Sequence, residues 1–94
     1  MYNKKYILNK VEEFTYRNPV HTKMEGALCY LAYFNVKERG LFLYVQPDWY
    51  DLTPHRVQTS LVKEVQYIDD RVIVTTQNTR YTFKAITHVG DMKD

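Results

Sequence analysis

The residues with the clearest potential for chemistry lie in the carboxy-terminal half and combine aromatic rings with basic side chains. Trp49 and Tyr50 are adjacent, in a segment bounded by prolines, and Arg56 follows shortly after them. Arg80 and Lys84 are four residues apart in an alternating region, so both face the same side of a strand. Exposed rings stack nucleic-acid bases while basic side chains bind the phosphates. These five residues therefore indicate a site for single-stranded nucleic acid or RNA.

Two short polar residues, Ser60 and Asn78, extend this candidate site. Together with Arg80 and the rings, they would line a pocket for a small ligand such as a nucleotide. Both also have a structural interpretation, because short polar side chains stabilise bulges and turns through hydrogen bonds to the backbone. Alternating Arg and Lys likewise keep the outer face of a half-exposed sheet soluble. The pattern leaves both interpretations open.

Catalytic and metal-binding patterns are weak by comparison. His21, His55 and His88 are widely spaced and Cys29 is a lone cysteine, so no local metal-ligand spacing is present. The sequence has no Gly-rich phosphate loop and no Gly-x-Ser-x-Gly motif. The adjacent Asp69-Asp70 pair fits a turn better than a pair of catalytic carboxylates, because neighbouring side chains on a strand face opposite sides. We therefore predict a protein that is not an enzyme and holds no metal or cofactor.

Composition restricts the partners and the compartment. The 94 residues carry 13 Lys and Arg against 11 Asp and Glu, a formal charge of +2, whereas duplex-DNA binders usually have a stronger basic excess. No apolar run reaches the roughly 18 residues of a membrane span, and the first residues lack the apolar core of a signal peptide. With a single cysteine, these features predict one cytoplasmic domain over residues 1–94 that has no membrane partner.

The elements that must position these residues are clearest near the carboxyl terminus. Residues 71–76 and 79–86 alternate with a period of two and are rich in β-branched and aromatic residues, so both are predicted strands. They predict an antiparallel hairpin that turns at Gln77 and Asn78, where Asn78 tolerates the positive φ of a tight turn. Tyr81 and Phe83 are expected to face inward.

A longer strand is predicted ahead of the hairpin, over residues 55–68. Its adjacent apolar residues Leu61-Val62 break the alternation, which indicates a bulge or sharp bend near Ser60 where the strand changes sheet face. A short strand is expected at residues 41–46, and the apolar segment at residues 27–34 fits a buried strand slightly better than a helix. Consecutive strands with short turns form a meander, and a small meander curls to bury one face.

The amino-terminal segment, residues 1–20, is predicted to be helical. Tyr6, Val11 and Phe14 recur at about the spacing of an amphipathic helix. The chain as a whole is thus predicted to be mainly β with some α, an α+β protein. Its β-rich body at residues 25–88 curls into a small barrel or half-barrel, and the helix caps one end.

Part of this β-rich body resembles a known group of sequences. A Trp-containing loop is followed by Thr59-Ser60-Leu61-Val62 and then by Thr76-Gln77-Asn78-Thr79-Arg80-Tyr81. The pattern Thr-Ser-x-Val, followed by Thr-x-Asn-(Ser or Thr)-x-Tyr, is similar to that of small uncharacterised proteins of phages, plasmids and integrative elements of Gram-positive bacteria. The resemblance covers residues 49–84. It implies a mobile-element origin and a compact β fold, and it implies no activity.

Binding is the function that these observations favour. The first hypothesis is a module for single-stranded nucleic acid that uses the aromatic and basic residues named above. The alternative is a protein-interaction or inhibitor module that acts on a host or element-encoded protein, with Trp49 as the anchor of its loop. Sequestration of a nucleotide is the third. A symmetric homodimer is also predicted, because the apolar segment at residues 27–34 is more than one small sheet readily covers.

Overall fold

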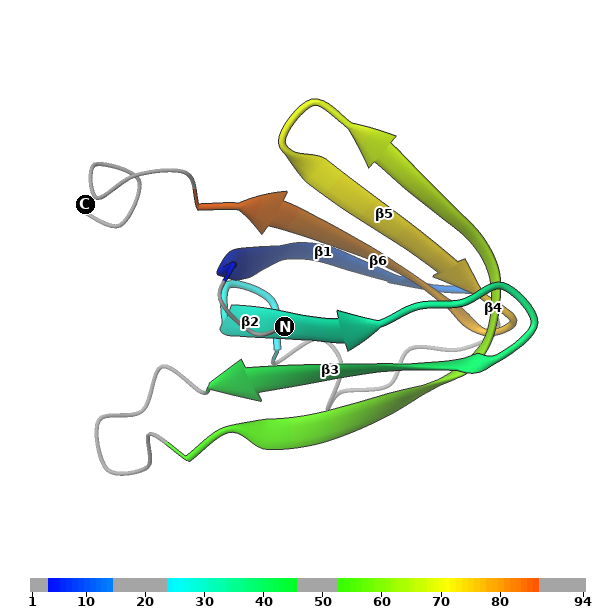
Figure 1. Ribbon diagram of the computed structural model, residues 1–94, viewed down its shortest axis with the longest axis horizontal. Helices are drawn as coiled ribbons and strands as arrows, with labels where there is room; N and C mark the ends of the chain where they lie inside the picture. Colours follow the sequence, from blue (N-terminus) through cyan, green and yellow to red (C-terminus); the bar gives the residue numbers. More distant parts are fainter. Residues whose placement is uncertain (1–3, 15–23, 46–52, 87–94) are drawn as a thin grey trace.

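The computed structural model describes residues 4–14, 24–45 and 53–86, which form an all-β fold (Figure 1). Six antiparallel strands follow one another in chain order around a closed barrel. The strands are β1 (Tyr6–Glu13), β2 (Leu28–Tyr33), β3 (Arg39–Val45), β4 (His55–Ile68), β5 (Arg71–Thr76) and β6 (Thr79–Ala85). Because β1 pairs with β6 and closes the ring, the predicted meander and its curling into a barrel are confirmed.

The predicted amino-terminal helix is wrong, and the α+β assignment is wrong with it. Residues 6–13 form β1, and the described part of the chain contains no helix. A β-bulge between Leu8 and Lys10 shifts the register against β6, so that Tyr6, Leu8 and Val11 all pack on the core. Core-facing residues of a regular strand recur every two residues, but the bulge separates Leu8 and Val11 by three. A separation of three residues is also the spacing of one face of a helix. Pairing with β6, a strand far along the chain, therefore determines that residues 6–13 are a strand and not a helix.

The strands predicted from the rest of the sequence are confirmed. β5 and β6 form the expected hairpin, β4 spans residues 55–68 as predicted, and β3 lies within one or two residues of its predicted bounds. The ambiguous apolar segment at residues 27–34 contains β2 and is therefore a strand. On β5 and β6, alternate side chains are buried, which is the burial pattern that the two-residue rhythm predicts.

Aromatic rings fill the barrel interior. Phe42, Tyr81 and Phe83 are at most 2% exposed, and their ring centroids lie between 5.1 and 6.1 Å apart. Tyr81 and Phe83 were expected to face inward, and they do. Because side chains occupy the centre of this small barrel, a partner or ligand must bind on its outer surface.

Gly40 lets a ring pack against the backbone of β3. Its N–H donates to Oγ1 of Thr59 at 2.8 Å. A Cβ atom at this position would lie 2.7 Å from Cε1 of Phe34 and closer still to Cδ1 of the same ring. We therefore expect Gly40→Ala to reduce the free energy of unfolding by about 1–3 kcal/mol through overpacking, as measured by urea denaturation. Gly40→Ala combined with Phe34→Leu is the control, and a loss that the smaller side chain does not reduce would contradict this explanation.

The apolar segment at residues 27–34 is mostly covered within the single chain. Ala27 and Cys29 are at most 1% exposed, and Tyr33 is the one residue of the segment that counts as exposed, at 46%. A single exposed ring is not an apolar patch. The described residues of this segment thus offer little fully exposed apolar surface, and the homodimer predicted from it stays a prediction.

Candidate functional site

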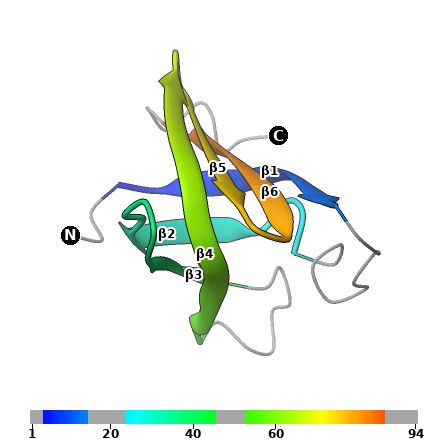
Figure 2. The ribbon, with the colours of Figure 1, turned by 90° about the vertical axis from the view of Figure 1, so that its right-hand side faces the viewer.

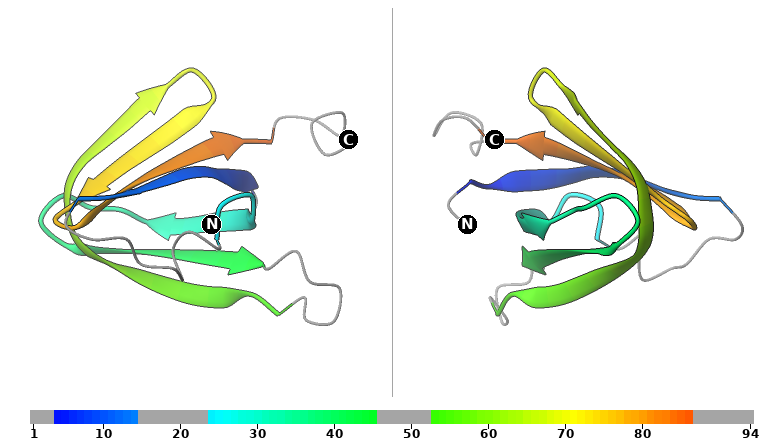
Figure 3. Two further views of the ribbon diagram at one scale, coloured as in Figure 1. Left: turned by 180° about the vertical axis from the view of Figure 1, so that it is seen from behind. Right: turned by 45° about the vertical axis from the view of Figure 1, so that its right-hand side comes forward.

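The candidate site lies where β4 bends. Its residues up to Leu61 pair with β3, and its residues from Val62 onward pair with β5. On β4, the register against β3 shifts between Gln58 and Leu61, and the register against β5 shifts between Val62 and Glu64, so Ser60 lies within the first irregularity. The predicted bend is confirmed, and Figure 3 shows β4 curving from the lower group of strands to the upper one.

Two turns are tied to this bend, one on each side. On the β3 side, the backbone N–H of Lys37 donates to the carbonyl of Val62, and the N–H of Val62 donates to the carbonyl of Glu38, both at 2.8 Å. On the β5–β6 side, Gln77 N–H donates to the carbonyl of Leu61 at 3.0 Å. Lys37 has a φ of 73°, a left-handed conformation that closes its turn tightly. The bend is therefore flanked by two turns held by hydrogen bonds, the turn at Lys37 and the β5–β6 turn, which form two walls.

A groove of about 530 Å³ crosses the outer surface between these walls. Val36 and Leu61 present aliphatic side chains that are 52% and 39% exposed. Two lysines and two side-chain amides accompany them. The lining residues are Val36, Lys37, Leu61, Val62, Lys63, Gln77 and Asn78. The groove thus offers an apolar floor beside two ammonium groups, and no carboxylate is among the described residues that line it.

Ser60 and Asn78, two of the predicted site residues, meet at this groove. The N–H of Asn78 donates to Oγ of Ser60 at 3.3 Å, and the carbonyl of Asn78 accepts from the N–H of Phe14 at 2.9 Å. Asn78 lines the groove, whereas Ser60 is not among the described lining residues. Ser60 therefore stabilises the turn through its side chain, as its structural interpretation predicts, whereas Asn78 takes part through its backbone groups.

The β5–β6 turn is held by threonines rather than by a left-handed Asn78. Among the described non-glycine residues, positive φ occurs at Lys37 and Asp69, so the expectation for Asn78 is wrong. Instead, Oγ1 of Thr76 donates to the carbonyl of Thr79 at 2.9 Å and accepts from its N–H at 3.1 Å. Oγ1 of Thr79 then donates to Glu13 at 2.9 Å. These buried and partly buried hydrogen bonds fix the wall that carries Gln77 and Asn78.

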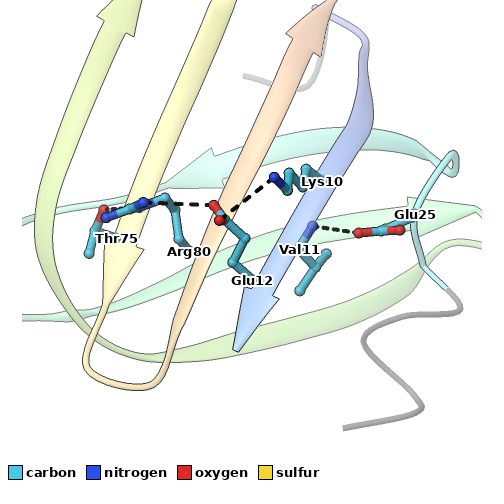
Figure 4. Close-up of polar contacts among 6 residues, drawn as sticks. All are labelled: Lys10, Val11, Glu12, Glu25, Thr75 and Arg80. Carbon is cyan, nitrogen blue, oxygen red and sulfur yellow. Dashed lines mark hydrogen bonds and ion pairs between the residues drawn. The ribbon is translucent and has the colours of Figure 1, made fainter. Parts of the chain in front are cut away.

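Arg80 faces the outer surface but is already occupied. Its guanidinium lies 3.7 Å from a carboxylate oxygen of Glu12, and its Nε donates to Oγ1 of Thr75 at 3.4 Å (Figure 4). It also stands 5.7 Å from the centroid of the Phe14 ring. A phosphate would have to compete with Glu12 for this side chain. Arg80 is therefore a weaker phosphate ligand than the sequence suggests.

The remaining predicted site residues do not gather around Arg80. Lys84 lies six residues beyond Asn78, about 20 Å along an extended chain, and its neighbour across β5 is Arg71. Arg56 pairs with Leu43 on the first half of β4, on another wall of the barrel. Trp49 and Tyr50 lie outside the described residues. Arg56, Arg80 and Lys84, the basic residues of the predicted site, are thus dispersed over the surface.

Among the described residues, the cysteine, the Asp69-Asp70 pair and the potential metal ligands bear on catalysis and metal binding. Burial raises the pKa of the Cys29 thiol to about 12, which suppresses the reactive thiolate. Asp69 and Asp70 form the β4–β5 turn, as expected. Within residues 4–14, 24–45 and 53–86, no three His, Cys, Asp or Glu side chains come together as metal ligands.

Sequence reasoning missed most of the groove, although one signal pointed to it. Leu61 and Val62 are consecutive apolar residues on a strand, so one of them had to face outward. Val62 is 1% exposed and Leu61 is the outward one. The wall formed by Val36 and Lys37 had no such signal, because a polar connection between strands does not reveal which strand it packs against.

Comparison with known proteins gives no indication of function, so the proposal below is based on the geometry of the site. None of the described residues form a helix of the length and apolarity that crossing a membrane requires. No family model matches this chain, and neither a curated protein nor a solved structure is significantly similar to it.

Proposed function

We propose that this protein is a non-enzymatic protein-interaction module whose groove binds an extended peptide segment of a partner. The single observation that carries the proposal is the pairing of exposed aliphatic side chains, Val36 and Leu61, with the ammonium groups of Lys37 and Lys63. An aliphatic side chain of the partner would fill the apolar floor, and neighbouring carboxylates would bind the lysines. The mobile-element origin remains a prediction from the residue pattern.

Several features make nucleic acid a less suitable occupant of this groove. Single-stranded nucleic acid binds by stacking its bases on aromatic rings, and no ring is among the described residues that line the groove. Arg80, the nearest predicted phosphate ligand, is engaged by Glu12. A nucleotide would meet the lysines but would find no ring among the described lining residues; the exposed Phe14 ring lies beside Arg80. Nucleic acid and nucleotides are therefore alternatives that the experiment must test.

The test is selection of peptides from a random phage-displayed library, followed by affinity measurement. We expect the selected peptides to combine Leu, Ile or Val with neighbouring Asp or Glu. Val36→Asp should weaken their binding at least about tenfold, because it places a charge on the apolar floor. Amide chemical shifts in an NMR titration should change most at residues 60–63 and 77–78.

Charge-matched variants separate the groove from the net charge. Lys63→Glu changes a groove residue, whereas Lys84→Glu makes the same change on exposed β6. The first should weaken peptide binding and the second should not. Fluorescent single-stranded DNA and RNA, and a nucleotide panel, are titrated in parallel at low salt. The proposal fails if an oligonucleotide or nucleotide binds and Lys63→Glu removes that binding, or if the selected peptides bind both variants equally.

A further inference from the structure

The second half of β4 has a strand edge that no other described strand covers. β3 pairs with β4 only as far as Leu61, and β5 pairs with Val62 through Ile68 on the opposite side. The turn at Lys37 and Glu38 covers the backbone of Val62. Beyond that turn, the upper half of β4 has β5 beside it on one side alone (Figure 2).

Large apolar side chains are exposed along this edge. Tyr67 is 77% exposed and Ile68 is 48% exposed. Tyr67 is two residues from Val65, which packs on the core, and it pairs with Val72, which is buried. Tyr67 therefore belongs to the inner face of the sheet, at a point where that face has no cover. An open edge with exposed apolar side chains is a template for another strand.

The edge is complementary to itself in an antiparallel arrangement. If two copies pair about a twofold axis at Gln66, Val65 lies opposite Tyr67 of the second copy and extends the apolar inner face. In the same arrangement, the β4–β5 turn, which carries Asp69 and Asp70, comes near Lys63 of the second copy, a residue of opposite charge. The symmetry repeats both contacts, so each acts twice. Shifting the register by one residue would place side chains of one face against those of the other.

We propose that the protein forms a homodimer by antiparallel pairing of the second halves of β4, with the twofold axis at Gln66. The two barrels then share one sheet in the order β6-β5-β4-β4-β5-β6. One short pair of strands gives weak association, with a Kd of about 10 µM to 1 mM. Tyr67 and Ile68, the apolar residues of the edge, do not line the groove, whereas Lys63 borders both surfaces. The dimer does not depend on the proposed peptide binding, because its strand pairing involves no other described lining residue.

Cysteine cross-linking tests the register. Gln66→Cys places two thiols opposite each other across the axis, where facing Cα atoms of antiparallel strands are about 4.5–5.5 Å apart, within the range of a disulfide. We expect this variant to form covalent dimers under mild oxidation much faster than Lys84→Cys, an exposed control on β6. The native Cys29 is buried and does not interfere. Equal rates for the two variants would contradict the proposal.

A charge exchange tests the same register without a covalent bond. Glu64 and Ile68 face outward and oppose each other across the axis. Ile68→Glu creates two pairs of facing carboxylates and should weaken dimerisation about tenfold, as measured by analytical ultracentrifugation. Adding Glu64→Lys should restore it, because both pairs become attractive. Val36→Asp should leave the dimer unchanged. A wild-type protein that stays monomeric up to about 1 mM, or a double variant as weak as Ile68→Glu, would overturn the proposal.

Discussion

Replacing Phe83 with alanine is expected to lower the free energy of unfolding by about 3–5 kcal/mol. Phe83 is 0% exposed, and its ring lies between 5.1 and 6.5 Å from those of Phe42, Phe34, Tyr81 and Tyr6. Deleting it removes contacts at the centre of the aromatic core. The surrounding strands are closed into a ring and cannot collapse fully around the space.

Equilibrium unfolding in urea measures this loss, and two variants calibrate it. Phe83→Leu keeps most of the apolar volume and should cost less than half as much. Phe14→Ala removes a ring that is 47% exposed and should change the stability by less than about 1 kcal/mol. A Phe83→Ala protein as stable as Phe14→Ala would mean that the aromatic cluster does not form the core.

Raising the pH above about 9 is expected to destabilise the fold strongly. Burial raises the pKa of Cys29 from 9.0 to about 12 and that of Tyr81 from 10.0 to about 12. Both groups ionise more readily in the unfolded chain, so the folded state retains more protons. Stability is therefore intact below the unfolded pKa values and is lost as the pH rises toward 12. At about 1.4 kcal/mol per pKa unit, the combined loss by pH 11 is about 4 kcal/mol.

Variants that cannot ionise assign this loss to its two sources. Cys29→Ala should remove the part that begins near pH 9, and Tyr81→Phe should remove the part that begins near pH 10. Both variants lose stability for packing reasons at neutral pH, so the quantity compared is the slope of unfolding free energy against pH. Unchanged slopes in both variants would show that other groups govern the alkaline transition.

The candidate site was predictable only in part. Ser60 and Asn78 were identified from residue type and do meet, because the bend of β4 brings the β5–β6 turn against it. Arg56, Arg80 and Lys84 were identified from charge and strand parity, but the register places them apart. The position of a residue in the two-residue alternation tells which face of the sheet its side chain occupies. Whether that side chain is available to a ligand depends on its neighbours on the adjacent strands. The ion pair between Glu12 and Arg80 could not be predicted, because Glu12 lies in a segment that was predicted to be helical and is in fact the strand beside Arg80.

By itself, the sequence determined the strands in which buried and exposed residues alternate without interruption. β5, β6 and most of β4 follow from alternation, because burial of one face of a sheet imposes a period of two on any strand. The consecutive pair Leu61-Val62 also determined the bend, since a strand cannot turn both side chains inward. These properties depend on neighbours within a few residues.

Tertiary structure alone decided β1, the groove and the open edge of β4. The bulge in β1 is defined by its pairing with β6, which lies about seventy residues later in the chain. The groove exists because turns that are far apart in sequence both bind the backbone of one bend. The open edge exists because β3 leaves β4 where β5 joins it. Each of these features is a hydrogen-bonding relation between distant segments, and local residue patterns carry no record of which segments will meet.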